Sequence, residues 1–126
     1  MPEAPDLHVI RELLTERIAG REGTAARVLR PTVLRSLASR DFSSDIVGRS
    51  VGSIDRRGKY LLLSLSGERM VAINPMLSGG LQYCAPTERV ARSTFLALSL
   101  SNGQELRYVD ADQMGMVYYI EHAMLH

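Results

Sequence analysis

A chain of 126 residues and 14.0 kDa has the length of one ordinary domain, and a domain of this size buries about two thirds of the surface that its unfolded form exposes. Hydrophobic residues make up 45% of the sequence and charged residues 23%, which excludes a disordered or fibrous protein. The formal net charge of +1 does not by itself indicate a nucleic-acid partner. Fourteen of the fifteen cationic side chains are Arg, so the single Lys, Lys59, is a candidate for a specific role.

Cys84 is the only cysteine, which excludes an internal disulfide and a cysteine-rich zinc site made by this chain alone. We interpret it as an idle thiol. The N-terminus lacks the basic start and the unbroken apolar run of a secretory signal, and no segment is long and apolar enough to cross a bilayer. The sequence therefore predicts a cytoplasmic protein of bacterial type, with no membrane part and with neither a metal nor a cofactor of its own.

The first predicted element is an amphipathic helix that begins after Asp6 and ends near Gly20. Asp6 is a suitable helix cap, and glycine is a typical stop. Pro2 and Glu3 are then expected in a short extended lead, close to the helix but outside its hydrogen-bonded body. The apolar residues recur at spacings of three and four, which predicts one buried face: Leu7, Ile10, Leu13, Leu14 and Ile18.

From Arg21 onward the sequence consists of short β-type segments separated by turn residues at 66–67, 78–80 and 101–103. Residues 94–100 alternate between an apolar and a mixed set, as in a strand with one face on the core. Residues 36–48 could hold a short helix capped near Asp41 or Ser43. We predict a mostly β protein with helices: an antiparallel β-sandwich of about eight strands, flanked by the N-terminal helix and a second short helix. Strands are expected in the segments ARVLR, VGRSVGSID, KYLLLSLS, MVAIN, TFLALSLS and ELRYVDA.

Proline at position 2 carries the sharpest chemical signal. Removal of Met1 would leave a secondary amine, and because an α-amino group titrates at about pH 8, a useful fraction is unprotonated at neutral pH. Attack of this amine on an aldehyde-like sugar carbon gives an iminium that has no nitrogen proton to lose. Such a cation is a strong electron sink and favours elimination of a neighbouring phosphate. Proline also occurs at this position without a catalytic role, so Pro2 alone does not decide the function.

Four motifs follow one another along the chain: MPEAPDLHVIREL at the N-terminus, DRRGKYLLL at 55–63, NPMLSG at 74–79 and DADQMG at 110–115. In order and spacing they resemble the formamidopyrimidine-DNA glycosylase and endonuclease VIII family of DNA-repair enzymes. Members of that family begin MPELPEVE and carry RRGKYLL, HLxMSG and DxRRFG segments. The resemblance runs from Met1 to about Val117, and the first two motifs together are specific.

The resemblance implies roles for three matching residues. Pro2 would be the Schiff-base nucleophile, and Glu3 would protonate the ring oxygen of the deoxyribose and assist later proton transfers. Lys59 would be the cation beside the scissile region, where its ammonium can donate to a phosphate or lesion oxygen. Without the resemblance, Glu3 would be interpreted as a carboxylate near a helix start and Lys59 as a solvated strand residue. Arg56 and Arg57 could also contact phosphates, although neighbours on one strand face opposite ways.

The last two motifs depart from the family pattern. Family members insert a Met, an Arg and a Phe into the duplex where the damaged nucleotide is everted. Here Leu77 occupies the position of the Met, with Met76 one place earlier, and Met114 occupies the position of the Phe. These residues are candidate DNA-binding wedges. Asp112 occupies the position of the Arg and cannot supply the hydrogen-bond donors of a guanidinium. Asn74 in place of the motif's His, and His8 in place of a helix carboxylate, are further departures.

The resemblance implies a base-excision-repair glycosylase with abasic-site lyase activity, which removes oxidised or damaged bases and nicks the strand by β/δ-elimination. Its partner would be double-stranded DNA containing damaged bases or abasic sites, with no obligate protein partner. Residues 1–126 would be the N-terminal catalytic domain of a longer chain, whose C-terminal half would carry a helix-two-turn-helix and a zinc finger. In that case the fragment alone would bind DNA weakly and show little activity. The alternative is a non-catalytic or divergent DNA-binding domain of the same fold that has lost normal lesion readout.

Overall fold

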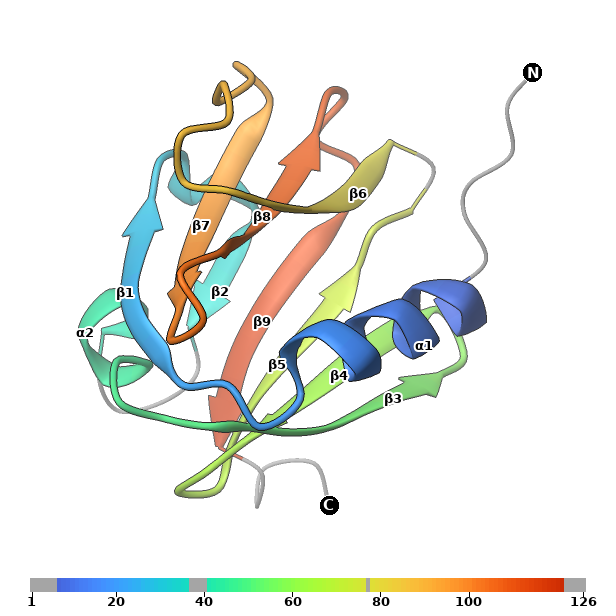
Figure 1. Cartoon of the computed structure of the whole chain (residues 1–126). Helices are drawn as coiled ribbons and strands as arrows, with labels where there is room; N and C mark the ends of the chain where they lie inside the picture. The colour runs from blue at the N-terminus through green and yellow to red at the C-terminus, as the bar shows by residue number, and fades with distance from the viewer. Residues whose placement is uncertain (1–6, 37–40, 77, 122–126) are drawn as a thin grey trace.

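The computed structural model describes residues 7–36, 41–76 and 78–121, which form a two-layered β-sandwich with two α-helices (Figure 1). One sheet has the strand order β1-β7-β8-β6 and the other β2-β9-β5-β4-β3. The predicted fold class is therefore confirmed. The elements are α1 (Leu7–Ile18), β1 (Gly23–Val28), the 3-10 helix η1 (Pro31–Val33), β2 (Leu34–Ser36), α2 (Phe42–Asp45), β3 (Val51–Arg57), β4 (Tyr60–Leu65), β5 (Arg69–Asn74), β6 (Gly79–Cys84), β7 (Thr94–Leu100), β8 (Glu105–Asp110) and β9 (Met116–Glu121).

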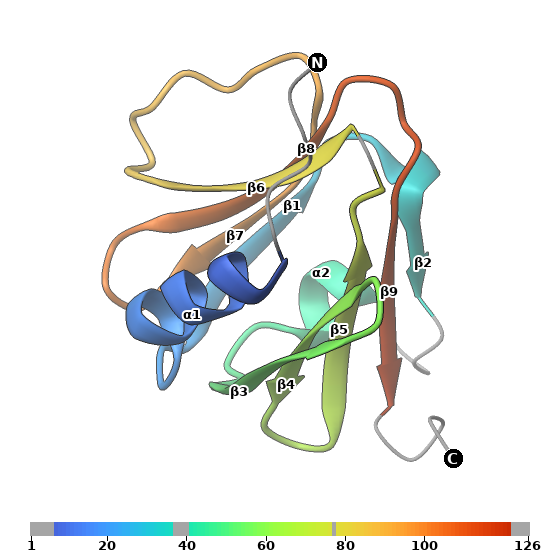
Figure 2. The ribbon, with the colours of Figure 1, turned by 90° about the vertical axis from the view of Figure 1, so that its right-hand side faces the viewer.

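The helix α1 ends where the sequence predicts. Gly20 has a φ of +83° and donates its N–H to the carbonyl of Val51 at 2.7 Å, which turns the chain out of the helix. Leu14 and Ile18 are buried, whereas Leu13 is 52% exposed, so the buried face is narrower than the apolar spacing suggests. The helix packs on β3 and β4 and lies along the open side between the two sheets (Figure 2). No helix among the described residues is long and apolar enough to span a membrane.

The strand pattern differs from the prediction in two respects. The described residues contain nine strands, and β2, β6 and β9 lie outside the segments in which strands are expected. β6 begins at Gly79, inside the predicted turn. β2 pairs with β9 in parallel, with Leu34 opposite Val117, so the sandwich is not wholly antiparallel. A strand of three residues has too few positions for a periodicity, and its partner lies about eighty residues further along the chain.

The core lies between the two sheets. Leu61, Leu63 and Leu65 of β4 alternate inward and are all buried, as the run of leucines predicts. Leu62 points to the outer face, where a smaller cluster with Met70, Ala72 and Ile120 covers that side of the sheet. β4 is therefore buried on both faces, which explains why three successive positions of this strand are leucine.

The strand β7 is also buried on both faces, although its sequence pattern indicates one mixed face. The reason is Arg107 on the neighbouring strand, which pairs with Ala97 in the register and is fully buried. Its guanidinium lies 2.9 Å from Glu105 and donates to the carbonyls of Glu88 and Arg89 at 3.0 and 3.2 Å. A loop held by these bonds covers the outer face of the sheet, so the small side chain of Ala97 leaves room for a buried ion pair.

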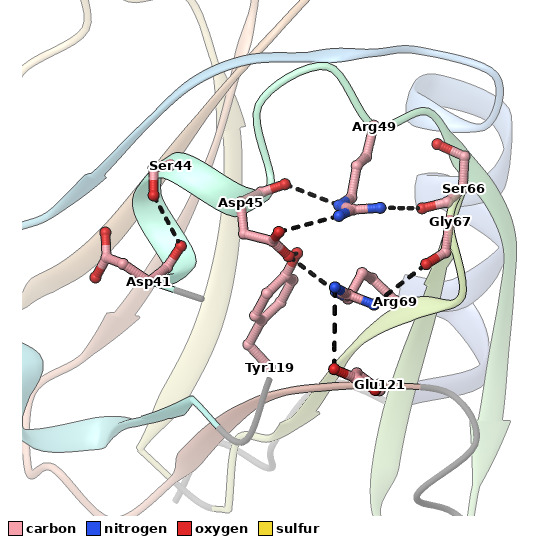
Figure 3. A network of polar contacts seen from close by, with 9 residues as sticks. All are labelled: Asp41, Ser44, Asp45, Arg49, Ser66, Gly67, Arg69, Tyr119 and Glu121. Carbon is pink, nitrogen blue, oxygen red and sulfur yellow. Dashed lines mark hydrogen bonds and ion pairs between the residues drawn. The ribbon is translucent and has the colours of Figure 1, made fainter. Parts of the chain in front are cut away.

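A second polar network attaches α2 to the five-stranded sheet (Figure 3). The carboxylate of Asp45 is buried and accepts from Arg49 at 3.0 Å, from Arg69 at 2.9 Å and from the hydroxyl of Tyr119. Burial opposes ionisation, but hydrogen bonds from Tyr119 and the two guanidiniums outweigh it and lower the pKa of Asp45 to about 2. The predicted short helix is thus confirmed, and a salt-bridge network anchors it although it has only one turn.

Replacing Asp45 with Asn should destabilise the fold by about 3 kcal/mol, because it leaves two partly buried guanidiniums without their carboxylate. Chemical denaturation at pH 7 measures the change in the free energy of unfolding. Asp55→Asn is the matched control, since Asp55 is an exposed carboxylate of β3. Equal stabilities of the two variants would contradict an anchoring role for the network.

The stabilising effect of Asp45 should also depend on pH. Because its pKa is depressed in the folded protein, its contribution is fully present above about pH 4 and is lost as the pH falls to about 2. The difference in the free energy of unfolding between the natural chain and Asp45→Asn should therefore be constant from pH 7 to about pH 4.5 and shrink below. If this difference in the free energy of unfolding grew on acidification instead, the pKa of Asp45 would not be depressed in the folded protein.

Candidate functional site

Two connections between the sheets lie side by side at one end of the sandwich. The chain passes from β5 to β6 through residues 75–78 and from β8 to β9 through residues 111–115. Asn74 pairs with Met116 in one sheet, and Gly79 pairs with Asp110 in the other, so the two connections start and end at paired positions. Both run along the upper end in Figures 1 and 2. We call the described residues of these connections, 75, 76 and 78 in the first and 111–115 in the second, the paired loops.

The carboxylate of Asp110 joins the paired loops. Its side chain accepts from the hydroxyl of Ser78 in the first loop, and from the backbone N–H groups of Met114 and Gly115 in the second at 3.3 and 2.7 Å. The hydroxyl of Tyr108 donates to it at 2.7 Å. One side chain thus receives hydrogen bonds from both loops and from the strand that precedes the second.

The electrostatics favour the charged form of Asp110. Asp110 is only 1% exposed, and this burial opposes ionisation of its carboxyl group. The hydrogen bonds from Ser78, Tyr108, Gly115 and Met114 outweigh the burial and lower the pKa of Asp110. Burial, together with the bond to Asp110, raises the pKa of Tyr108 far above its ordinary value, so its hydroxyl stays a donor. The carboxylate is therefore charged at neutral pH and holds four donors.

Two glycines at the base of the paired loops make this arrangement sterically possible. A Cβ on Gly115 would overlap the Tyr108 hydroxyl and lie 2.5 Å from the carbonyl oxygen of Asn74. A Cβ on Gly79 would also overlap the Tyr108 hydroxyl and lie 2.5 Å from the carbonyl oxygen of Pro75. Glycine is needed at both positions because backbone and a phenol approach it closely. These are the final glycines of the NPMLSG and DADQMG motifs.

Two of the predicted wedge residues expose apolar side chains from the paired loops. Met76 is 41% exposed and Met114 is 45% exposed. Met76 has a φ of +54°, and Gln113, beside Met114, has a φ of +55°, a left-handed conformation that is uncommon for residues with a side chain. Leu77 lies outside the described residues. Asp112 is exposed in the second loop, where the family pattern has an Arg.

The predicted cations lie on a second feature, the hairpin of β3 and β4. Lys59 is exposed in its two-residue turn, and Arg56 and Arg57 are exposed at the end of β3. The guanidinium of Arg56 donates to the carbonyl of Gly58 at 3.0 Å, which holds it against the turn. Pro2 and Glu3 lie outside the described residues, so their approach to Lys59 stays a prediction.

Reasoning from the sequence missed the residues that organise the site. Asp110, Ser78 and Tyr108 are structural partners of the paired loops, and none of them is among the predicted site residues. Ser78 and Asp110 do stand inside the two matching motifs, as does Gly115. Motif membership was thus the available signal, but only the folded chain brings these two motifs, more than thirty residues apart, into contact. No group of three or more His, Cys, Asp or Glu side chains that could hold a metal occurs in the part of the chain that the structure describes.

The sandwich has the same fold as a protein whose structures in complex with DNA are solved. The Lactococcus lactis Fpg, in complex with DNA that contains an abasic site, superposes with a TM-score of 0.88 and 18% sequence identity, over 98% of this chain and 46% of that one. The same protein with Fapy-dG-containing DNA gives a TM-score of 0.87 over 94% of this chain and 44% of that one. At this identity the likeness establishes the fold.

The sequence establishes the family. The profile described as formamidopyrimidine-DNA glycosylase N-terminal domain matches residues 1–117, and the chain belongs to that family. The formamidopyrimidine-DNA glycosylase of Pelotomaculum thermopropionicum is 35% identical over 120 residues, and that of Moorella thermoacetica is 33% identical over 118. These matches cover 95% and 94% of this chain but only 44% and 43% of the relatives, so the chain spans less than half of their length. The family resemblance drawn from the motifs is confirmed.

Substituting Gly115 with Ala should destabilise the protein by roughly 2 kcal/mol, because the new methyl group overlaps the Tyr108 hydroxyl and two other oxygens. Thermal unfolding followed by circular dichroism measures the effect. Gly52→Ala is the control, since a Cβ there would lie 3.5 Å from the nearest oxygen, an ordinary contact, and should change the stability by less than about 1 kcal/mol. Equal effects at the two glycines would show that the base of the loops is not tightly packed.

Proposed function

We propose that the protein is a base-excision-repair DNA glycosylase with abasic-site lyase activity. Membership of the formamidopyrimidine-DNA glycosylase family carries this proposal. The paired loops support it, because they present apolar side chains at the end of the sandwich where the two matching motifs meet. The proposed partner is double-stranded DNA that contains damaged bases or abasic sites. The bacterial relatives support a bacterial-type enzyme that acts in the cytoplasm.

In the proposed reaction the freed nitrogen of Pro2 attacks C1′ of the damaged nucleotide, and the base departs. Glu3 protonates the ring oxygen, the sugar opens, and an iminium links Pro2 to C1′. The iminium accepts the electrons released when a proton leaves C2′, so the 3′ phosphate is eliminated, and a second elimination releases the 5′ phosphate. Hydrolysis of the iminium then frees Pro2. The step requires that Met1 be removed, since Pro2 otherwise carries an amide nitrogen.

The arrangement of α1 and the β3–β4 hairpin supports the role of Lys59. The beginning of α1 and this hairpin lie at the same side of the molecule (Figures 1 and 2). Only four residues separate Pro2 from Leu7 in the sequence, and five residue steps span at most about 18 Å. The amine is therefore within about 18 Å of Leu7, which supports the proposal that it acts beside Lys59, Arg56 and Arg57. We propose that Lys59 stabilises charge on the sugar-phosphate, and that the two arginines orient the backbone.

The exposed methionines support a role in filling the duplex. An everted nucleotide leaves a gap in the base stack, and apolar side chains can occupy such a gap. Met76, Leu77 and Met114 are the proposed wedges. Asp112 would repel phosphates and can only accept hydrogen bonds from a base, so we expect lesion and opposite-base preferences that differ from those of members with an Arg there.

A second function stays open on one observation. Asp112 and Met114 replace the Arg and Phe of the family pattern, which would suit a DNA-binding domain that kept the fold but lost normal lesion readout. Such a protein would bind damaged duplex without turning it over.

Reduction with borohydride separates the two functions, because it traps an iminium as a stable covalent adduct. After removal of Met1, the full-length protein should form an adduct with DNA that contains an abasic site, whereas Pro2→Gly should lower the yield at least tenfold. Glu3→Gln should reduce base release while DNA affinity, measured by fluorescence anisotropy, stays within about twofold. Asp55→Asn is again the control and should leave the adduct yield unchanged. An undiminished adduct in Pro2→Gly would exclude Pro2 as the nucleophile, and binding without any adduct in the natural chain would favour the non-catalytic alternative.

The domain organisation is part of the proposal. The chain spans 44% of its relative from Pelotomaculum thermopropionicum, so the remaining length of such relatives has no counterpart in these 126 residues. We propose that residues 1–126 act as the N-terminal catalytic domain of a longer protein, and that a zinc finger and a helix-two-turn-helix belong to its C-terminal half. The proposed chemistry takes its nucleophile and its acid from this chain.

A further inference from the structure

Among the residues that the structure describes, two aspartates are buried, and they differ in the groups that stabilise their charge. Asp45 is bound by two guanidiniums, as expected for a carboxylate with a structural role. Asp110 is buried more deeply, and its hydrogen-bond donors are two hydroxyls and two backbone N–H groups, all of them neutral. None of the ion pairs within residues 7–36, 41–76 and 78–121 includes Asp110. Burying a charge without a cation beside it costs free energy. The hydrogen bonds that stabilise the charge of Asp110 come largely from the paired loops, so the carboxylate holds these loops in place.

The loops need such an anchor because each of them contains an unfavourable backbone conformation. Met76 and Gln113 both adopt positive φ values, and neither is a glycine. Residues in this region keep their conformation only where the surrounding structure enforces it. In the first loop the bonds come from Ser78 to Asp110 and from Met76 N–H to the side chain of Asn74 at 3.3 Å. In the second loop, the N–H groups of Met114 and Gly115 donate to the carboxylate of Asp110. The N–H of Gln113 donates to the backbone carbonyl of Asp110 at 3.2 Å.

We propose that Asp110 is a positioning residue that couples the paired loops into one rigid tip, so that Met76 and Met114 keep a fixed separation and move as a unit. The use of this tip on DNA rests on the proposed function. Asp110 does not contact the substrate, because its carboxylate is buried beneath the loops that carry the two methionines. It acts through those loops. The rigid tip lowers the conformational entropy that insertion between bases would otherwise cost.

The chemistry of the tip points to the base stack. Its exposed apolar atoms come from Met76 and Met114, and the charged residue between the ends of the second loop is the acidic Asp112. An acidic, apolar tip gains little from phosphates but can bury thioether groups against bases. This chemistry fits the wedge role in the proposed function, with the cations of the β3–β4 hairpin left to contact the backbone.

Coupling between the loops can be measured without DNA. The variant Ser78→Ala removes the hydrogen bond from the first loop to Asp110. Its effect is measured by NMR on protein labelled with 13C at the methionine methyl groups. If Asp110 couples the loops, the methyl signals of both Met76 and Met114 should shift and their order parameters should fall, although Met114 belongs to the other loop. The buried Met70 is the internal reference and should not change. Ser53→Ala, on the exposed face of β3, is the control variant. A response confined to Met76 would overturn the coupling.

Asp110→Asn extends the test to DNA. The amide keeps the shape of the side chain but has one acceptor oxygen in place of two, so it cannot hold all four donors. Lyase activity on an abasic site is compared in duplex and in single-stranded DNA, because only the duplex requires a gap to be filled. The ratio of duplex to single-strand activity should fall about tenfold in Asp110→Asn and stay constant in Asp55→Asn. Equal losses on both substrates would indicate general unfolding and overturn the positioning role. These activities are measured on the full-length protein; if it shows no lyase activity at all, the proposed function fails, while the methyl signals still decide whether Asp110 couples the loops.

Discussion

The structure depends on one topological constraint: the chain crosses between the two sheets three times at the same end of the sandwich, after β1, β5 and β8, and the last two of these crossings form the paired loops. β5 and β9 are neighbours in one sheet, and β6 and β8 are neighbours in the other, so the crossings from β5 to β6 and from β8 to β9 must run side by side. Backbone and side chains are crowded where they meet, which is why Gly79 and Gly115 stand at their base. This constraint brings two motifs that are distant in the sequence onto one surface.

Buried carboxylates help to hold three segments that the hydrogen bonds of the sheets do not hold. Asp45 attaches a one-turn helix through arginines, and Asp110 attaches the paired loops through neutral donors. Both carboxylates keep a depressed pKa despite their burial, because each accepts several hydrogen bonds. A third buried pair, Arg107 and Glu105, holds a loop over the outer face of the four-stranded sheet. In each case a costly buried charge orders a segment that has little regular structure of its own.

The residues that match the family pattern and those that depart from it stand side by side in the paired loops. The scaffold of the tip is complete: Ser78, Gly79, Asp110 and Gly115 all match the motifs and all take part in one arrangement. Two of the residues that change, Asp112 and Met114, are exposed on that scaffold and make none of these contacts through their side chains. A third, Asn74, is buried and accepts the N–H of Met76, so one departure lies within the scaffold itself. Substitution at Asp112 or Met114 can therefore change the exposed surface of the tip without disturbing how the tip is held.

Taken alone, the sequence determined the class of fold, the limits of α1, the presence of strands β1, β3, β4, β5, β7 and β8, and the family to which the chain belongs. These features are local, since a period of apolar residues or a run such as RRGKYLLL is read within a few residues. Tertiary structure alone decided the parallel pairing of β2 with β9, the burial of both faces of β7, and the joining of Ser78 to Asp110. Each of those depends on residues that lie far apart along the chain and meet only when the two sheets pack. The same reason explains why the paired loops could be named from their motifs, whereas the carboxylate that holds them together could not.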